Sequence, residues 1–281
     1  MHTVKSALEE AFVTIERIDA QVLMAHVLGV DRAWLLANPM RILTETEDAR
    51  VDMLVAQRAL GQPVAYLVGR REFYGRDFAV GPEVLIPRPE TETLVETALE
   101  CLHRPRGTAD PWSLLDLGTG SGAIAVTLAC ERPDVRIVAT DASAEALDLA
   151  RRNAQAHGCA ERIEFVQGSW YEAVPGRRFD LVVANPPYVA SGDAHLADGD
   201  LRFEPGAALT DGSPDGLDSI RAIVAGAREH IAQDGMLLFE HGYDQGDAVA
   251  RLLAAAGFAS TVSVKDLAGI PRVSGGKMDG A

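Results

Sequence analysis

The sequence predicts an α/β protein in which a small helical region and a β-hairpin precede a doubly wound, mostly parallel sheet. Three observations lead to this class. Apolar residues recur at helical spacing over residues 4–60, aromatic residues separated by glycines fill residues 64–80, and from Trp112 onward apolar strands alternate with amphipathic helices. Such alternation is typical of parallel strands that helices cover on both faces.

Three helices are expected in the first 62 residues. The first carries apolar residues from Val4 to Ile15, the second ends at Gly29, and the third begins at Thr44, which can form a capping box with Glu47. No chemical motif falls in this region, so we expect it to bind a partner rather than to perform chemistry.

The stretch 64–80 is broken by Gly69 and Gly75, which favours a β-hairpin. Pro87 and Pro89 then hold an extended loop before the next helix. We therefore expect three parts. They are a helical domain at residues 1–62, a hairpin linker at residues 63–84 and the α/β domain at residues 85–281.

Seven strands are expected in the α/β domain. The predicted strands are 113–117, 135–140, 162–166, 179–184, 235–240 and 258–264, with a last strand at 270–276 that runs antiparallel at the edge. The predicted helices between them are 122–131, 144–157, 216–232 and 243–256.

The chain is acidic, with 41 Asp and Glu against 26 Lys and Arg and a net charge of −15. Proteins that grip nucleic acid gain affinity by neutralising phosphates, so we expect no direct contact with nucleic acid. No apolar run suits a membrane span, and Glu9 and Glu10 stand where a signal peptide needs an apolar core, so a cytoplasmic protein is expected. Cys101, Cys130 and Cys159 form no Cys-x-x-Cys pair, and no metal is expected.

A glycine-rich turn, LLDLGTGSGAIAV over residues 114–126, joins a predicted strand to a predicted helix. Gly118, Gly120 and Gly122 let the backbone approach a ligand at the carboxyl end of the strand. The turn also fits the dinucleotide fingerprint, so a nicotinamide enzyme is an alternative, and a turn that serves packing alone is another.

Asn185-Pro186-Pro187-Tyr188 directly follows the fourth predicted strand. Asn185 Oδ1 and the Pro186 carbonyl are two acceptors that can hold both N–H bonds of an NH₂ group and favour a pyramidal nitrogen. The Tyr188 ring offers a π face to an amide or to a methylsulfonium. No general base is needed, because the nitrogen becomes acidic once it is methylated. The motif therefore predicts methyl transfer from S-adenosylmethionine to an amide or amino nitrogen, and it disfavours a dehydrogenase, which needs an acid–base residue.

Three further residues suit such a cofactor. Asp141 ends the second strand, 19 residues after Gly122, where it can accept both ribose hydroxyls or cap the following helix. Trp170 follows the third strand, where its indole can cover an adenine or pack in the core. Asp116 lies inside the first strand and can hold the glycine turn or face the cationic end of the methyl donor, and both roles stay open.

These motifs resemble the release factor glutamine methyltransferases. The resemblance lies in LIPRPETE (85–92), the glycine turn, GSWY (168–171), NPPYV, GDLRFEPGAAL (199–209), DGLDSIRAI (215–223) and LLFEHG (237–242). It implies a Rossmann-like class I S-adenosylmethionine methyltransferase domain behind the helical domain and the hairpin. It also implies methylation of the glutamine side-chain nitrogen in the Gly-Gly-Gln motif of class-one peptide chain release factors.

The resemblance also assigns residues by position. Carried onto this chain, it implies that Gly118, Thr119, Gly120, Ser121, Gly122, Asp141 and Trp170 hold the cofactor, with Asn185 counted among them. Asn185, Pro186, Pro187 and Tyr188 would hold the glutamine amide, with Asn185, Pro186 and Tyr188 catalytic, and Arg88 and Pro89 would help close the site.

Several alternatives to a release factor remain open. One is a glutamine of a ribosomal protein, which the RFEP stretch (202–205) disfavours. Another is amino-methylation of nucleic acid, which the charge disfavours, and a third is a cofactor-binding protein without activity. We expect a monomer.

Overall fold

The computed structural model describes residues 2–102, 110–197 and 199–278. The chain forms two compact units, one of Met1–Arg70 with Ala197–Phe203 and one of Arg71–Leu196 with Glu204–Ala281. No helix within the described ranges is long and apolar enough to cross a membrane.

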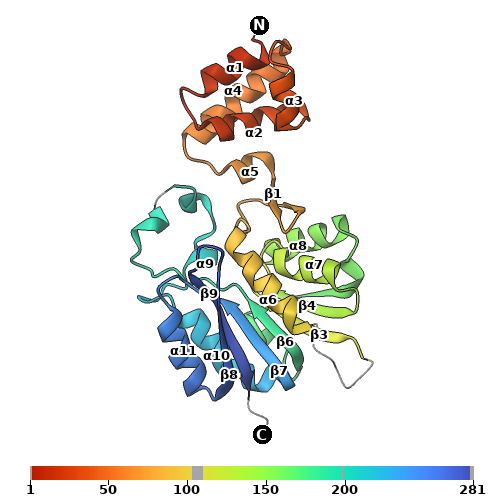
Figure 1. Ribbon diagram of the computed structural model, residues 1–281, viewed down its shortest axis with the longest axis vertical. Coiled ribbons are helices and arrows are strands. Elements are labelled where there is room, and N and C mark those ends of the chain that lie inside the picture. Colours follow the sequence, from red (N-terminus) through yellow and green to blue (C-terminus); the bar gives the residue numbers. More distant parts are fainter. Residues whose placement is uncertain (1, 103–109, 198, 279–281) are drawn as a thin grey trace. The chain divides into compact units, whose positions relative to one another are not determined.

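The first unit is a group of short helices (Figure 1). They are α1 (Val4–Ala11), α2 (Arg17–Leu28), α3 (Arg32–Ala37), α4 (Glu45–Ala59) and α5 (Val64–Val68). Apolar residues of α1, α2 and α4 share one buried core. Gly29 ends α2 in the left-handed conformation, and Thr44 with Glu47 forms the capping box of α4, so both predicted signals are confirmed.

Two predictions for this unit are wrong in part. The first helix ends at Ala11 rather than near Ile15, because the chain turns there and α2 packs back against α1, although Ile15 still packs against the core. The sequence pattern also missed α3, which has only six residues and is too short to show a period. Asp31 caps it by accepting a hydrogen bond from the Trp34 backbone N–H at 2.7 Å.

A distant segment, Ala197–Phe203, completes the first unit. Arg58 on α4 donates from Nε to Asp19 Oδ2 and from Nη1 to Asp200 Oδ1, each at 2.6 Å. Arg202 donates to the Leu60 carbonyl. These bonds hold the segment on the helices, an arrangement that no local sequence pattern indicates.

The predicted hairpin is shorter than expected. Residues 64–68 form α5, which Pro63 precedes and Gly69 ends at φ 74°, and only β1 (Arg70–Phe73) and β2 (Arg76–Ala79) are strands. Proline at a helix start and glycine at a helix end are the usual signals, and they outweigh the β preference of the aromatic residues. Tyr74 and Gly75, both at positive φ, make the two-residue turn.

The second unit is built on a seven-stranded sheet with strand order β5-β4-β3-β6-β7-β9-β8. The strands are β3 (Trp112–Leu117), β4 (Val135–Asp141), β5 (Ile163–Gln167), β6 (Phe179–Ala184), β7 (Ile231–Glu240), β8 (Phe258–Lys265) and β9 (Pro271–Met278). The helices and 3₁₀ turns of this unit are η1 (Pro89–Thr91), α6 (Glu92–Leu102), α7 (Ala123–Glu131), α8 (Ala144–Ala156), η2 (Ala160–Arg162), η3 (Trp170–Ala173), η4 (Ala194–Ala197), α9 (Gly206–Leu209), α10 (Asp218–His230) and α11 (Gly246–Ala255). The remaining 3₁₀ turn, η5 (Leu201–Phe203), lies in the segment that belongs to the first unit. The doubly wound α/β class is confirmed.

Strands β3 to β7 run parallel and β9 runs antiparallel, as predicted. The position of β9 was not predicted correctly, because it lies between β7 and β8, and β8 forms the edge. Small residues allow this insertion. A Cβ at Gly275 would lie 1.9 Å from the Leu237 carbonyl oxygen, so only glycine lets β9 approach β7 at this point.

Two predicted boundaries shift. Helix α10 ends at His230 and β7 begins at Ile231, four residues before the predicted strand. Arg178 Nη1 donates to the carbonyl of Arg228 at 3.2 Å and to that of Ile231 at 2.7 Å, which satisfies the end of the helix. Helix α11 begins at Gly246 rather than near residue 243.

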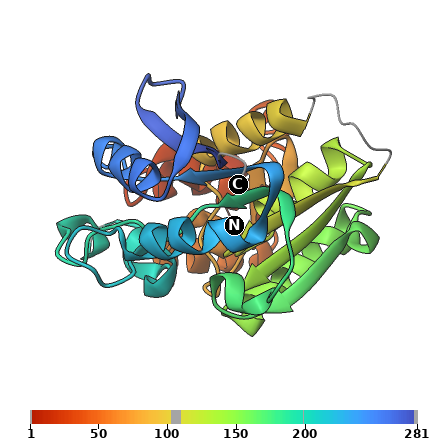
Figure 2. The ribbon, with the colours of Figure 1, turned by 90° about the horizontal axis from the view of Figure 1, so that it is seen from below.

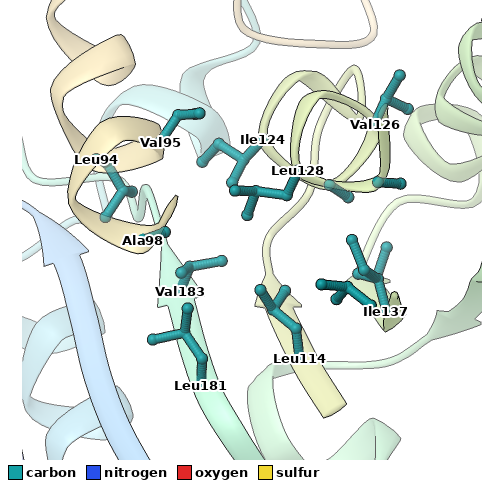
Figure 3. Close-up of a cluster of buried hydrophobic side chains, with 14 of the residues drawn as sticks. Leu94, Val95, Ala98, Leu114, Ile124, Val126, Leu128, Ile137, Leu181 and Val183 are labelled. Atoms are coloured by element: carbon teal, nitrogen blue, oxygen red, sulfur yellow. The ribbon is translucent and has the colours of Figure 1, made fainter. Parts of the chain in front are cut away.

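Helices cover both faces of the central sheet (Figures 1 and 2). Alternate residues of its central strands pack against opposite helical layers. Leu114 and Leu181 pack with residues of α6 and α7, whereas their neighbours Leu115 and Val182 pack with residues of α10 and α11. Figure 3 shows the first of these layers, with side chains of α6 and α7 meeting those of β3, β4 and β6. Because β3, β4, β6 and β7 run parallel, their carboxyl ends meet at one edge of the sheet, where polar residues gather.

Candidate active site

The glycine turn after β3 takes the shape that the sequence predicts. Gly118, Gly120 and Gly122 have φ of 71°, 55° and 80°, a region that other residues rarely adopt. A Cβ on Gly122 would come within 3.1 Å of Ala150 Cβ, so this glycine also lets α7 approach α8 closely. A Cβ on Gly118 would lie 3.5 Å from the Trp170 ring. The turn is thus placed for close approach of a ligand by its backbone.

Asp116 supports this turn from below. Its Oδ2 accepts a hydrogen bond from Thr119 Oγ1 at 2.6 Å, and the residue is fully buried. Its Oδ1 has no hydrogen-bond partner among the described residues. Burial raises the pKa of Asp116 to about 7, against the hydrogen bond from Thr119, which lowers it. Of the two predicted roles, the geometry matches the one in which Asp116 holds the turn.

Asp141 lies at the end of β4, facing the same turn. Its Oδ2 accepts the Gly120 N–H and its Oδ1 accepts the Ser143 N–H, each at 2.9 Å. Ser143 itself caps α8 by accepting the Ala146 N–H at 3.0 Å. A carboxylate has about four acceptor positions, so Asp141 keeps lone pairs for two further hydroxyl donors. Its roles as a cap and as a ribose acceptor are therefore compatible.

A cavity of about 290 Å³ opens at this edge of the sheet. Glycine-turn residues, Asp141 and Trp170 line it together with Asn185, Pro187 and Arg88. Of the predicted site residues, those that line the cavity are Arg88, Gly118, Thr119, Gly120, Ser121, Asp141, Trp170, Asn185 and Pro187, and those outside its lining are Pro89, Gly122, Pro186 and Tyr188. Its volume, its acidic acceptor and its indole suit a nucleoside cofactor such as S-adenosylmethionine.

Asn185 begins a chain of hydrogen bonds in the wall of the cavity, which Thr91 also lines. Its Nδ2 donates to Thr91 Oγ1 at 3.1 Å, and the Thr91 hydroxyl donates to Glu240 Oε2 at 2.7 Å. Tyr188 Oη donates to the other oxygen, Oε1, of Glu240 at 2.9 Å. Glu240 is buried, which raises its pKa, while the bonds from Thr91 and Tyr188 oppose the rise. Over residues 2–102, 110–197 and 199–278, Asn185 Oδ1 has no partner and remains available as an acceptor.

The loop that carries Tyr188 is held by backbone contacts. Gln245 Nε2 donates to the carbonyls of Tyr188 and Asp215, both at 2.9 Å, while its Oε1 accepts the Gly242 N–H at 2.8 Å. A Cβ on Gly216 would lie 2.1 Å from the Tyr188 carbonyl oxygen, so the loop packs directly on glycine. The shape of this loop therefore depends on residues from three separate segments.

Arg88 is held by a second buried carboxylate. Its guanidinium donates to Glu204, which also accepts the Ile86 N–H at 3.0 Å. Arg88 lines the cavity, whereas Pro89 begins η1 and is exposed. Of the two residues that were expected to help close the site, Arg88 therefore lies in the cavity wall, held by Glu204, and Pro89 lies outside it.

Sequence reasoning missed four residues of this site, Thr91, Glu204, Glu240 and Gln245. Glu240 left a signal, since a carboxylate that ends the apolar run MLLF is out of place unless it has partners. The others lie in loops or at a helix start, where no periodic pattern marks them. Apolar cavity residues were missed as well, and these include Val84, Leu85, Ile124, Pro205, Ala207 and Ala208.

By sequence, the chain matches the Methyltransferase small domain over residues 96–200 and the PrmC N-terminal domain over residues 1–69. A release factor glutamine methyltransferase from Burkholderia pseudomallei is 52% identical over 271 residues, which cover 95% of this chain and 93% of the relative. Another, from Xylella fastidiosa, is 51% identical over 266 residues, which cover 95% and 94%.

Solved structures show the same fold. A methyltransferase from Pyrococcus furiosus has a TM-score of 0.52 at 17% identity, covering 78% of this chain and 94% of that chain. A 16S rRNA methyltransferase from T. thermophilus, in complex with AdoMet and guanosine, has a TM-score of 0.53 at 20% identity, covering 75% of this chain and 50% of that chain.

Proposed function

This chain belongs to the release factor glutamine methyltransferase family, and from this membership we propose which of its residues carry the reaction. It is an S-adenosylmethionine-dependent enzyme that methylates a glutamine of release factors. We propose that this glutamine is the one in the Gly-Gly-Gln motif of class-one factors. Flanking glycines have no side chains, so such a loop can carry the glutamine deep into a narrow site.

The observation that carries the assignment of residues is the shared cavity. Asp141 and the glycine turn line one part of it, and Asn185 lines another. A donor held by the first set therefore lies in the same space as an acceptor held by the second. We propose that Gly118 to Gly122, Asp141 and Trp170 hold S-adenosylmethionine, which supplies an electrophilic methyl group on a positively charged sulfur.

The acceptor side needs only to orient the amide. Asn185 Oδ1 accepts one N–H of the substrate glutamine, and the Pro186 carbonyl accepts the other. Tyr188, whose hydroxyl is bound by Glu240, offers its ring to the amide group. The nitrogen is acidic after the transfer, so its extra proton leaves to solvent without a dedicated base. Pro187 and Arg88 complete the wall on this side.

The helical part, residues 1–62, is proposed to bind the release factor away from the chemistry, with residues 63–84 as linker and residues 85–281 as the catalytic domain. Such remote contacts would help to position the amide, so a short substrate that lacks them is expected to react poorly. We also propose that the enzyme acts in the cytoplasm, in keeping with a release factor as its substrate. We further propose that it acts as a monomer and contacts no nucleic acid, in keeping with its net charge of −15.

The test offers labelled S-adenosylmethionine and enzyme to four substrates in parallel. They are a class-one release factor, the same factor with its Gly-Gly-Gln glutamine changed to alanine, a preparation of ribosomal proteins, and DNA. Label is expected in the first alone, and mass spectrometry should place one methyl group on the glutamine. Equal labelling of the alanine variant would overturn the choice of residue, and label in ribosomal protein or DNA would support one of the alternatives.

A further inference from the structure

We propose that Thr91 and Glu240 are positioning residues that determine which end of the Asn185 amide faces the substrate. The inference rests on the proposed function, in which Asn185 Oδ1 accepts an N–H of the glutamine. It concerns two residues that come from other elements, Thr91 from η1 and Glu240 from the end of β7.

The directions of the hydrogen bonds carry the argument. An asparagine side chain can turn by half a rotation and exchange its oxygen for its NH₂ group, with little change in shape. Only the oxygen is useful toward a substrate NH₂, because an NH₂ group facing another NH₂ group forms no bond. Something must therefore select one of the two orientations before the substrate arrives.

Thr91 makes that selection because its hydroxyl has a single hydrogen. This hydrogen goes to Glu240 Oε2 at 2.7 Å, so toward Asn185 the Thr91 oxygen can act only as an acceptor. Asn185 meets it with Nδ2 at 3.1 Å, and Oδ1 is left for the cavity. In the reversed orientation two acceptor oxygens would face each other, and the Asn185 NH₂ would lose its partner.

Glu240 in turn directs Thr91. Both of its oxygens accept, one from Thr91 and the other from Tyr188 Oη at 2.9 Å, so neither hydroxyl is free to turn its hydrogen elsewhere. Glu240 is 1% exposed and Thr91 is 4% exposed, so water has little access to these bonds. Arg272 and Glu90 are the charged groups whose fields reach Glu240, and neither bonds to it.

Thr91→Val is the first test, since it removes the hydroxyl at nearly constant volume. We expect kcat on the release factor to fall about 10- to 100-fold, somewhat less than the loss of a direct transition-state contact. The affinity for S-adenosylhomocysteine should stay within about twofold, because the cofactor side does not use this hydroxyl. Thr91→Ser keeps the hydroxyl and should restore most of kcat. Thr97→Val is the matched control, because Thr97 is a buried threonine of the following helix whose hydroxyl donates to the Thr93 carbonyl.

A double-mutant cycle separates positioning from general disturbance. If Thr91 acts through Asn185, adding Thr91→Val to Asn185→Ala should lower single-turnover methylation by less than about twofold. A further loss equal to that seen in the wild-type background would overturn the proposal. A normal kcat in Thr91→Val would also overturn the proposal. So would a Thr91→Ser variant whose kcat is as low as that of Thr91→Val.

Glu240→Gln tests the other link and stands on its own if Thr91→Val does not fold. Glutamine must present an NH₂ group to one of its two hydroxyl partners, which disturbs the direction of the chain. We expect Glu240→Gln to lower kcat, and we expect this effect to disappear in the Asn185→Ala background. An unchanged kcat would remove Glu240 from the proposal. A wild-type enzyme that fails to label the release factor would instead refute the proposed function, so the two failures are distinguishable.

Discussion

Replacing Asp141 tests the cofactor side of the site most directly. In Asp141→Ala the carboxylate disappears, and with it the acceptors of the Gly120 and Ser143 N–H groups. In the proposed complex, two ribose hydroxyls of the cofactor also donate to this carboxylate. The variant therefore loses both the order of the glycine turn and its polar contacts with the cofactor.

The size of each effect of Asp141→Ala depends on whether water can replace the lost carboxylate as a hydrogen-bond acceptor. Asp141 is only half-buried and faces the cavity, so water can bind the two N–H groups in the free enzyme, and the free energy of unfolding should fall by only about 1 kcal/mol. In the complex the ribose hydroxyls are cut off from water and lose a charged partner. That should weaken binding by about 1–3 kcal/mol, or about 5- to 150-fold in Kd.

The assay is calorimetric titration with S-adenosylhomocysteine, with thermal unfolding of the free protein measured in parallel. Asp148→Ala serves as the control, because Asp148 is exposed on the adjoining helix α8, where its carboxylate pairs with Arg151. An unchanged Kd for Asp141→Ala, with or without a loss of stability, would show that Asp141 caps the turn and does not hold the ribose.

Three shorter predictions concern Asn185, Gly216, which packs against the Tyr188 loop, and the buried carboxylate of Asp116. Asn185→Ala should leave the affinity for S-adenosylhomocysteine nearly intact. In a single-turnover assay it should lower the methyl-transfer rate at least about 100-fold, which corresponds to a barrier higher by about 3 kcal/mol. Normal turnover would contradict the amide-binding role. Gly216→Ala should lower the free energy of unfolding by about 2 kcal/mol or more in a denaturant titration. The reason is that residue 216 has a φ of 65° and that a Cβ there would lie 2.1 Å from the Tyr188 carbonyl oxygen. An equally stable variant would mean that the loop can move aside. Asp116 has a folded pKa of about 7, above its unfolded value, so the stability that it contributes is fully present below pH 4 and is lost as the pH rises to 7. Asp116→Asn should remove this part of the pH dependence of unfolding, and identical profiles would show that Asp116 does not titrate in this range.

Features that lie within one short stretch of chain were predictable from the sequence. The alternation of strands and helices after Trp112 gave the doubly wound class, because burial on both faces demands continuous apolar strands. The turn at Gly118 to Gly122 and the loop at Asn185 could be placed at the same sheet edge, since each directly follows a parallel strand. The boundary signals failed where two preferences competed, as in residues 64–68, where the cap residues outweighed the β preference.

The partners of these residues were decided only by the tertiary structure. Asn185 bonds to Thr91, 94 residues away, and Thr91 bonds to Glu240, 149 residues away. Sequence periodicity reports which face of an element is buried, but it carries no information about which distant polar atoms meet there. That depends on strand order and on how α6 packs on the sheet. The sequence by itself thus determined the fold class and the reacting motif, whereas the order of strands in the folded sheet decided which way the amide of that motif points.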